Sequence, residues 1–381
     1  MDLDLTWLLW GLPLAFAAGW FASRFDLRQL RFQSQQAPKA YFRGLNHLLN
    51  EQQDQAIDAF IEAVQGDPDT AELHFALGNL FRRRGDYDRA VRVHEHLLAR
   101  ADVKGKDRER AQHALALDFL KAGLLDRAES ALHKLEGTSF EGEALLALLA
   151  IYERSRDWPQ ARRIAERLDA AQPGSFATRL AHYLCEEAEQ QQRNGRTEQA
   201  LTLLEQAAQQ APQLPRAWLA ISALKAEAGQ PGAAMDALVT LANEAPQGLP
   251  LAAKALADLS RQTGRQTQAL GLLQAWQDRS PSLDVTEALA ALSTDPGAVR
   301  TRYLDHLARE PSLVIATQWL AGETLSEPAG QARVMAALEK ASTPLKRYRC
   351  AACGFEARQH FWQCPGCQGW DSYPARRVEE L

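Results

Sequence analysis

The chain has 381 residues, a formal net charge of −5 and a pI near 6.0. Its length exceeds what one compact core usually holds, and its mildly acidic balance gives no general attraction to nucleic acid. Four of its five cysteines lie within the 18 residues from Cys350 to Cys367. Disulfide scaffolds spread their cysteines more evenly, so this clustering indicates a reducing compartment and a metal site.

Residues 5–23 form an uncharged stretch of 19 residues. As a helix it would span roughly 28 Å, close to the ~30 Å hydrocarbon core of a bilayer. Tryptophans stand toward both ends, where membrane interfaces favour them. A signal peptide would begin with basic residues, and a repeat array would not cover a helix that is apolar on all sides. We therefore predict a transmembrane anchor over residues 1–23.

The charges that flank this stretch predict its orientation. Arg24, Arg28 and Arg31 follow it, whereas no lysine or arginine precedes it. The positive-inside rule places the rest of the chain in the cytoplasm, which in a Gram-negative cell means the inner face of the inner membrane. Residues 24–37 are expected to be a juxtamembrane linker, either a helix lying along the headgroups or a plain tether.

The segment over 37–70 is the unit that the chain repeats. It predicts two short helices, 38–50 and 53–65, with Gly44 and Ala56 where the helices cross and Pro68 as the stop. The frame is the 34-residue tetratricopeptide (TPR) pattern. Its alanine recurs six times, at Ala90, Ala128, Ala161, Ala200, Ala234 and Ala269. We predict an all-α solenoid of seven to eight repeats over 38–343, closed by capping helices at 312–323 and 328–342.

A groove that binds partner proteins is expected on the first helices of the repeats. The register places Asn79, Arg82 and Arg83 in the second repeat and Arg110 in the third. An asparagine beside guanidinium groups resembles the carboxylate-binding grooves of some TPR proteins. The alternative is a solvated helix end whose cations suit the helix dipole. No phosphate-binding loop, zinc-protease or nucleophile-elbow motif is present, so we expect no enzymatic activity.

The last segment, 344–381, carries the sequence's most specific chemical signal. Its spacing is C-x₂-C-x₁₀-C-x₂-C, and two such pairs can each form a tight knuckle around one ion. The expected ligands are Cys350, Cys353, Cys364 and Cys367. Four sulfurs suit zinc or a single iron, and the flanking aromatics resemble rubredoxin, which holds iron. A redox pair would need a βαβ setting, so we expect a structural metal.

Anchor, TPR array and rubredoxin-like tail, in this order, resemble the lipopolysaccharide assembly protein B family. The resemblance covers essentially the whole chain and is densest at 40–52, at 73–85 and in the tail, while 195–310 carries no family-specific motif. It implies a non-enzymatic inner-membrane adaptor. Such proteins promote degradation of the lipid A-committing deacetylase by a membrane-anchored AAA metalloprotease. It also implies contacts with other lipopolysaccharide assembly proteins and makes the four clustered cysteines the metal ligands.

Two other classes of function remain open at this point. An electron carrier would use the tetracysteine site with reversibly reduced iron and an exposed edge. A nucleic-acid-binding ribbon would stack bases on the tail's aromatics and would need a basic face, which thiolates around a divalent ion do not favour. Self-association is possible, and Cys185 is expected to be a small buried residue.

Overall fold

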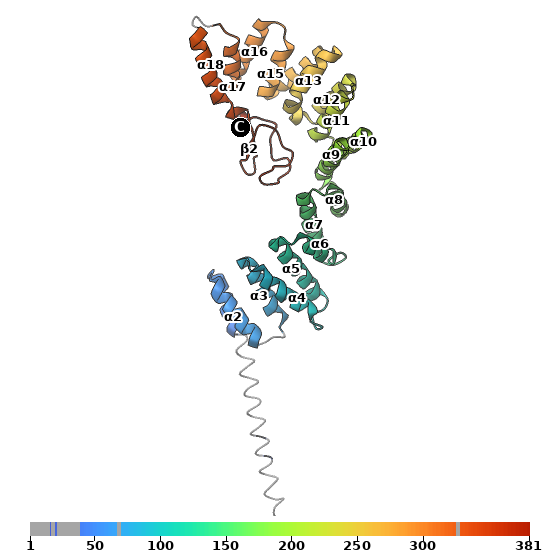
Figure 1. The fold of residues 1–381 in the computed structure, drawn as a ribbon, viewed down its shortest axis with the longest axis vertical. Coiled ribbons are helices and arrows are strands. Elements are labelled where there is room, and N and C mark those ends of the chain that lie inside the picture. The colour runs from blue at the N-terminus through green and yellow to red at the C-terminus, as the bar shows by residue number, and fades with distance from the viewer. Residues whose placement is uncertain (1–15, 17–19, 21–38, 67–69, 325–327) are drawn as a thin grey trace, which may run out of the picture. The chain divides into compact units, whose positions relative to one another are not determined.

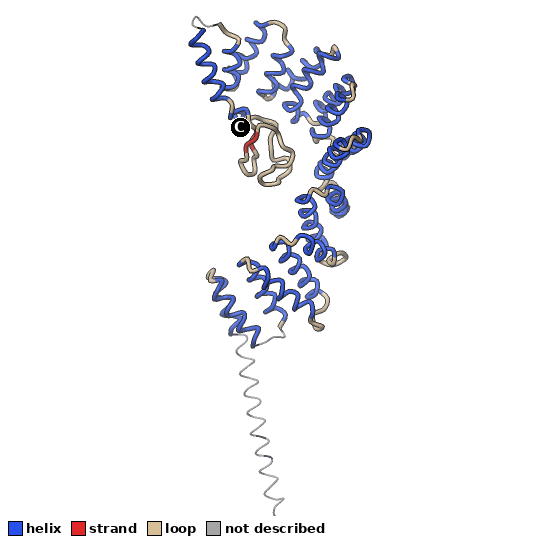
Figure 2. Tube along the Cα trace, in the orientation of Figure 1, coloured by secondary structure: helices blue, strands red, loops and turns tan. Residues whose placement is uncertain are grey.

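The computed structural model describes residues 16, 20, 39–66, 70–324 and 328–381. Helices dominate this part of the chain (Figures 1 and 2), and it divides into two compact units, one ending at Ser155 and the other beginning at Arg156. The predicted anchor over 5–23 and linker over 24–37 lie outside the described residues, except for Phe16 and Trp20. None of the described helices is long and apolar enough to cross a membrane.

The first unit is a series of antiparallel helix pairs. A helix over 39–49 precedes the others. They are α2 (Gln53–Gly66), α3 (Ala71–Arg84), α4 (Tyr87–Ala99), α5 (Lys106–Ala122), α6 (Leu125–His133) and α7 (Glu141–Ser155). The first two helices agree with the predicted 38–50 and 53–65. Glycines with positive φ end α3 at Gly85 and α5 at Gly123, which is the usual way to stop a helix and satisfy its last carbonyls.

Small residues decide how closely the helices of a pair approach. The recurring alanine of the repeat is at most 1% exposed at every position from Ala56 to Ala269. Gly44 lies against the Phe60 ring, where an added Cβ would come within 3.0 Å of it. At Gly78 an added Cβ would lie 2.5 Å from His94 Nε2. Larger side chains at these positions would push the helices apart, so the 34-residue pattern encodes the packing itself.

The second unit begins at Arg156 and is also built of consecutive helices. Its helices are α8 (Trp158–Ala171), α9 (Ala177–Arg193), α10 (Thr197–Gln210), α11 (Pro215–Glu227), α12 (Pro231–Glu244), α13 (Leu249–Thr263), α14 (Gln266–Arg279), α15 (Leu283–Leu292), α16 (Pro296–Arg309), α17 (Leu313–Ala321) and α18 (Pro328–Ser342). A proline stands two residues after the end of each of the helices α8, α10, α12 and α14, at Pro173, Pro212, Pro246 and Pro281. The last two helices lie where the capping helices were predicted, and Cys185 is buried as expected, at 1% exposed.

A small ribbon follows α18 and packs against the helices of the second unit (Figure 1). A short helix, η2 (Pro344–Lys346), leads into β1 (Tyr348–Arg349), which pairs antiparallel with β2 (Glu356–Ala357). The remaining backbone is mostly turns, and a final short helix, η3 (Val378–Glu380), ends the chain. The core of the ribbon is Tyr348, Cys350, Cys364 and Tyr373, with Leu251 of α13 packed against it. The ribbon therefore shares its small core with the array.

Candidate metal centre and its docking on the array

The four cysteines of the ribbon converge on one point. Their sulfur atoms all lie within 4.8 Å of one another. The Sγ atoms of Cys350 and Cys367 are 3.8 Å apart, and those of Cys353 and Cys364 are 3.6 Å apart. A tetrahedral ion with metal–sulfur bonds of about 2.3 Å places its ligands roughly 3.8 Å apart. The geometry therefore fits a four-sulfur metal site.

The thiols of the site do not all ionise with equal ease. The Phe355 N–H favours the thiolate of Cys353, but burial and hydrogen bonds with the other cysteines outweigh it and raise the pKa of Cys353 to about 12. Burial opposes ionisation of Cys350, but hydrogen bonds from Ser372 and nearby backbone N–H groups outweigh it and lower the pKa to about 6. Burial acts in the same way on Cys364, whose pKa is likewise lowered by backbone N–H groups, one of them on Gly366, 3.4 Å from the sulfur. Four adjacent thiolates repel one another unless a cation lies between them. Zinc and iron both satisfy this donor set.

Turn residues in each knuckle give the sulfurs their direction. Gly354 has a φ of +77° and donates its N–H to the Cys350 carbonyl. In the second knuckle the Cys364 N–H donates to the Gly369 carbonyl, and Gln368 has a φ of +60°. Positive φ is costly for a residue other than glycine, so the knuckle holds this loop in a conformation it would otherwise avoid.

The second knuckle runs directly into the residues that dock on the array. The Trp370 ring lies 4.6 Å from the His182 ring and 6.0 Å from the rings of both Trp158 and Tyr183, measured between centroids. Both carboxylate oxygens of Asp371 lie 2.9 Å from His182 Nε2. This contact joins the metal loop to helices α8 and α9 of the second unit.

Burial favours the neutral form of His182. Its side chain is fully buried, and burial lowers the pKa of the imidazole more than the Asp371 hydrogen bond raises it. The hydrogen bonds are satisfied by one tautomer, in which Nε2–H donates to Asp371 and Nδ1 accepts from Arg216 at 3.4 Å. Arg216 is itself 5% exposed and donates to Glu186 and Glu189. A buried polar network thus lies behind the contact.

The C-terminal tail makes a second, separate attachment. Arg377 donates two hydrogen bonds to the Asp284 carboxylate, at 2.7 and 2.8 Å, and its guanidinium lies 4.1 Å from the Tyr348 ring centroid. Glu379 accepts from the Ser312 hydroxyl and from the backbone N–H groups of Leu313 and Val314. A carboxylate at a helix N-terminus accepts hydrogen bonds from N–H groups that have no partner within the helix, and its negative charge interacts favourably with the helix dipole.

Glu380 repeats this arrangement on a neighbouring helix. Its carboxylate accepts from the Leu283 N–H at 2.8 Å and from the Arg377 N–H at 2.6 Å. Burial raises the pKa of Glu380, and these backbone hydrogen bonds oppose the shift. The tail therefore ties η3 to the first turns of α15 and α17.

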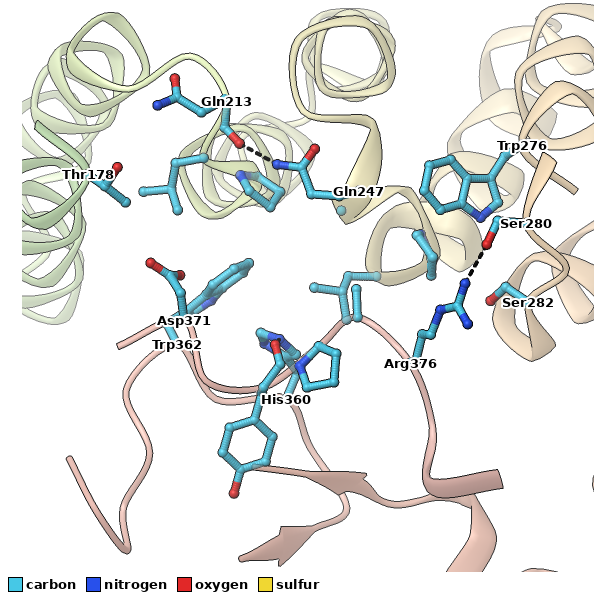
Figure 3. A pocket seen from close by; sticks show the side chains of 18 residues that line it. Thr178, Gln213, Gln247, Trp276, Ser280, Ser282, His360, Trp362, Asp371 and Arg376 are labelled. Atoms are coloured by element: carbon cyan, nitrogen blue, oxygen red, sulfur yellow. Dashed lines mark hydrogen bonds between the residues drawn. The ribbon is translucent and has the colours of Figure 1, made fainter. Parts of the chain in front are cut away.

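A cavity of about 550 Å³ lies along the seam between the ribbon and the array (Figure 3). On the array side Gln247 Nε2 donates to the Gln213 carbonyl at 2.7 Å. On the ribbon side Arg376 donates to the Ser280 hydroxyl at 2.5 Å. Two polar atoms in the wall, Ser282 Oγ and Trp276 Nε1, are buried without a partner among the described residues. The seam is thus less tightly closed here than at Trp370 and Asp371.

The four residues expected to line a partner groove lie in the first unit, where three of them are hydrogen-bonded to neighbouring side chains. Arg82 donates to the buried Asp118 carboxylate at 2.8 Å and to Asn79 at 2.6 Å. Arg110 pairs with Glu72 at 2.6 Å. Arg83 is exposed. Arg82 and Asn79 thus belong to one network, whereas Arg83 is directed to solvent, and the binding role of all four remains a prediction.

Sequence reasoning did not find the docking residues. His182 contacts the ribbon and His94 bonds the buried Asp118, and no sequence pattern around either histidine indicated such a contact. One signal was available in the tail: the charged residues from Arg376 to Glu380 follow the last aromatic of the ribbon and serve no metal knuckle. Nothing in their spacing indicated which helices they would contact.

The fold and the site together define a class: a TPR protein with a C-terminal rubredoxin-like metal-binding ribbon. Family models agree. A model described as a rubredoxin metal-binding domain matches residues 348–373, and tetratricopeptide-repeat models match residues 73–109 and 192–259.

Relatives over the full length identify the family. Lipopolysaccharide assembly protein B of Escherichia coli K12 is 30% identical to this chain over 392 aligned residues, with 100% of both chains covered. The protein of the same name from Haemophilus influenzae is 28% identical over 97% of both chains. The chain belongs to the lipopolysaccharide assembly protein B family.

The solved structures that match this chain do so at low sequence identity and with TM-scores below 0.5. The Naa15/Naa10 complex bound to HypK-THB matches 81% of this chain with a TM-score of 0.44 and 17% identity, and 47% of that chain is covered. A tetratricopeptide repeat protein from Parabacteroides merdae matches 68% of this chain and 99% of its own, with a TM-score of 0.35 and 13% identity.

Proposed function

We propose that this protein is a membrane-anchored cytoplasmic adaptor that regulates lipopolysaccharide synthesis. In this role it brings the lipid A-committing deacetylase to a membrane-anchored AAA metalloprotease and so promotes degradation of the deacetylase. Membership of the lipopolysaccharide assembly protein B family supports the pathway, and the TPR array supports protein binding as the activity. Confining partners to one plane raises their effective concentration without new contacts.

The observation that carries the proposal is the docked ribbon. All four positions around the metal site are protein sulfurs, which leaves no open position for a substrate. Bound metal would be held by Cys350, Cys353, Cys364 and Cys367 and would supply folding energy to a segment with little core of its own. The ribbon in turn contacts α8, α9, α13, α15 and α17 of the array. A ribbon that is folded around a metal and packed against a protein-binding array would make the array more rigid, which is consistent with an adaptor.

A crosslinked pull-down from membranes tests this function. Wild type is compared with Cys364→Ser and with a chain lacking residues 1–23, and the half-life of the deacetylase is followed in the same cells. We expect the protease and the deacetylase to co-purify with wild type, and both variants to lose the protease and to prolong the half-life several-fold. Degradation at the wild-type rate without residues 1–23 would refute the role of the anchor.

Electron transfer is the second candidate, because part of the metal centre is accessible. Cys353 and Cys367 are exposed, whereas Cys350 and Cys364 are buried. An electron carrier needs such an edge together with reversibly reduced iron. Metal analysis with a redox titration distinguishes the two functions, since bound zinc, or iron that is not reversibly reduced, excludes electron transfer.

A further inference from the structure

We propose that the second unit carries a recognition site for a tryptophan–aspartate pair, and that Trp370 and Asp371 of the ribbon occupy this site within the same chain. The site consists of Trp158 on α8, His182 and Tyr183 on α9, and Arg216 on α11. When the loop that carries Trp370 and Asp371 leaves the site, the same site takes a tryptophan–aspartate pair from a partner protein. The inference rests on the proposed adaptor function and assigns a specific ligand chemistry to it.

The aromatic part of the site is built by the array alone. Trp158 and Tyr183 stack on each other with centroids 6.0 Å apart and an interplanar angle of 21°. Trp370 meets both rings edge-on, at 71° and 76°. Edge-to-face contacts between large rings are favourable beyond their buried area. These walls fit a planar indole better than an aliphatic side chain.

The polar part of the site binds the carboxylate of the residue that follows the tryptophan. His182 Nε2–H faces both Asp371 oxygens at 2.9 Å, and its ring lies 4.6 Å from Trp370. Arg216 contacts the other side of the imidazole and places a buried positive charge behind it. Asp371 keeps 43% of its side-chain exposure, so a carboxylate can reach His182 from solvent. Hydrogen bonds to a charged acceptor are stronger than neutral ones, so aspartate is preferred to asparagine.

The present occupant is held in place by the metal loop. Trp370 follows Cys367 by three residues, and the Asp371 N–H donates to the Trp362 carbonyl at 2.9 Å. Gln368 and Asp371 both have positive φ, at 60° and 51°. A loop in this conformation depends on the closed knuckle, so loss of the metal weakens the hold of the pair on the site. The tail contacts of Arg377, Glu379 and Glu380 do not involve the loop and keep the ribbon attached.

Binding of a peptide copied from the chain itself tests the site. The probe is a fluorescein-labelled peptide of residues 368–373, Gln-Gly-Trp-Asp-Ser-Tyr, and the receptor is the full chain carrying Trp370→Ala and Asp371→Ala with its metal in place. We expect saturable binding by fluorescence anisotropy. Wild type, whose site is filled, should bind at least about tenfold more weakly, a difference of ~1.4 kcal/mol.

Two matched changes show whether binding occurs at the proposed site. Replacing the aspartate of the peptide by alanine, or adding His182→Ala to the receptor, should each weaken binding by about tenfold or more. Equal binding of the two peptides, or unchanged binding by the His182→Ala receptor, would overturn the proposal. Metal content and circular dichroism of each receptor confirm that it is folded.

Removing the metal from the wild-type chain tests the proposal independently, without any substitution. Wild-type chain treated with a chelator should bind the peptide more tightly than the metal-loaded wild-type chain does, because its own pair is then held less firmly in the site, and adding metal back should reverse this. Failure of the stripped chain to bind would refute the link between metal and site. Because no arm uses the deacetylase or the protease, a negative result here leaves the adaptor function standing, and a failed pull-down leaves the site standing.

Discussion

Arg82 is bound into the interior of the first unit. Its guanidinium donates to the Asp118 carboxylate, which is fully buried, and to the Ala114 carbonyl. Asp118 also accepts from His94, whose Nε2 has no hydrogen-bond partner among the described residues. A buried carboxylate that loses its cation leaves an uncompensated charge in a medium of low polarity. The stability of the first unit therefore depends on Arg82.

Replacing Arg82 and Arg83 separately tests this assignment. We expect Arg82→Ala to lower the free energy of unfolding of the first unit by about 3 kcal/mol, because Asp118 stays buried. Arg83→Ala serves as the control and should change it by less than about 0.5 kcal/mol, since Arg83 is exposed. Urea denaturation measures both. A stable Arg82→Ala chain would show that the buried carboxylate is compensated by other groups.

His306 makes the stability of the second unit depend on pH. It is 4% exposed, and burial lowers its pKa, an effect that Arg309 increases and that Glu310 and Glu379 oppose. Thr286 Oγ1 and Gln277 Nε2 lie 2.9 and 3.3 Å from its Nδ1. The unfolded chain binds a proton near pH 6.5, where the folded chain does not, so the free energy of unfolding falls as the pH drops below about 6.5.

The variant His306→Asn should therefore be less sensitive to acid than wild type. Denaturation at pH 7.5 and pH 5.5 gives the loss of stability for each chain, and the variant's loss should be smaller. The variant should still lose some stability in acid, because burial also lowers the pKa of His182 and His360. The metal site is identical in both chains and cancels in the comparison. As a control, the variant His96→Asn, which replaces an exposed histidine, should lose as much stability between pH 7.5 and pH 5.5 as wild type does. A loss in His306→Asn equal to that of wild type would contradict the assignment.

At the scale of elements, helix ends are where the tail stabilises the array. Glu379 accepts from the first N–H groups of α17, and Glu380 accepts from that of α15. Ser312 adds a side-chain cap on the Ile315 N–H at 2.9 Å. These helices belong to the last repeats before α18, where fewer repeats stack on one another than in the middle of the array, so such caps matter more there.

The variant Glu379→Ala should lower the free energy of unfolding of the second unit by about 1–2 kcal/mol, through the lost cap and the lost charge at the helix N-terminus. Glu205→Ala, which removes an exposed carboxylate from α10, is the matched control and should have little effect. Hydrogen exchange localises the change, with faster exchange expected at Leu313 and Val314. Protection equal to wild type at these amides would show that the carboxylate is dispensable.

At the scale of the whole molecule, the ribbon and the array of the second unit fold as partners. The ribbon's core residues include two of the metal cysteines, and Leu251 of the array packs against them. Segments of this size bury too little apolar surface to fold alone, so metal ligands and docking contacts supply the missing stability.

Removing the metal should therefore unfold the ribbon and leave the helices folded. Chelation is expected to expose the amides of Cys350 and Cys364 to exchange, while those of α10 and α12 keep their protection. Metal analysis of variants provides the control. Cys364→Ser should fall from one ion per chain to nearly none, whereas Cys185→Ser, at a buried cysteine outside the ribbon, should retain one. Unchanged ribbon protection after chelation would disprove metal-dependent folding.

The sequence alone determined the features whose information is local. The helix pairs and their small crossing residues follow from spacings within 34 residues, as Ala56 and Gly44 illustrate. The convergence of the cysteines follows from two pairs ten residues apart, since each knuckle needs little besides its own turn. The family resemblance rested on these same segments and was confirmed over the full length.

Only the tertiary structure decided where the ribbon docks. His182 and Asp371 are 189 residues apart in the chain, and Arg377 and Asp284 are 93 apart. Their meeting depends on the small rotation that each repeat adds to the one before it, summed along the array. No local pattern encodes that sum. The metal ligands could therefore be identified from residue spacing, whereas the aromatic and charged residues that hold the ribbon became visible only in three dimensions.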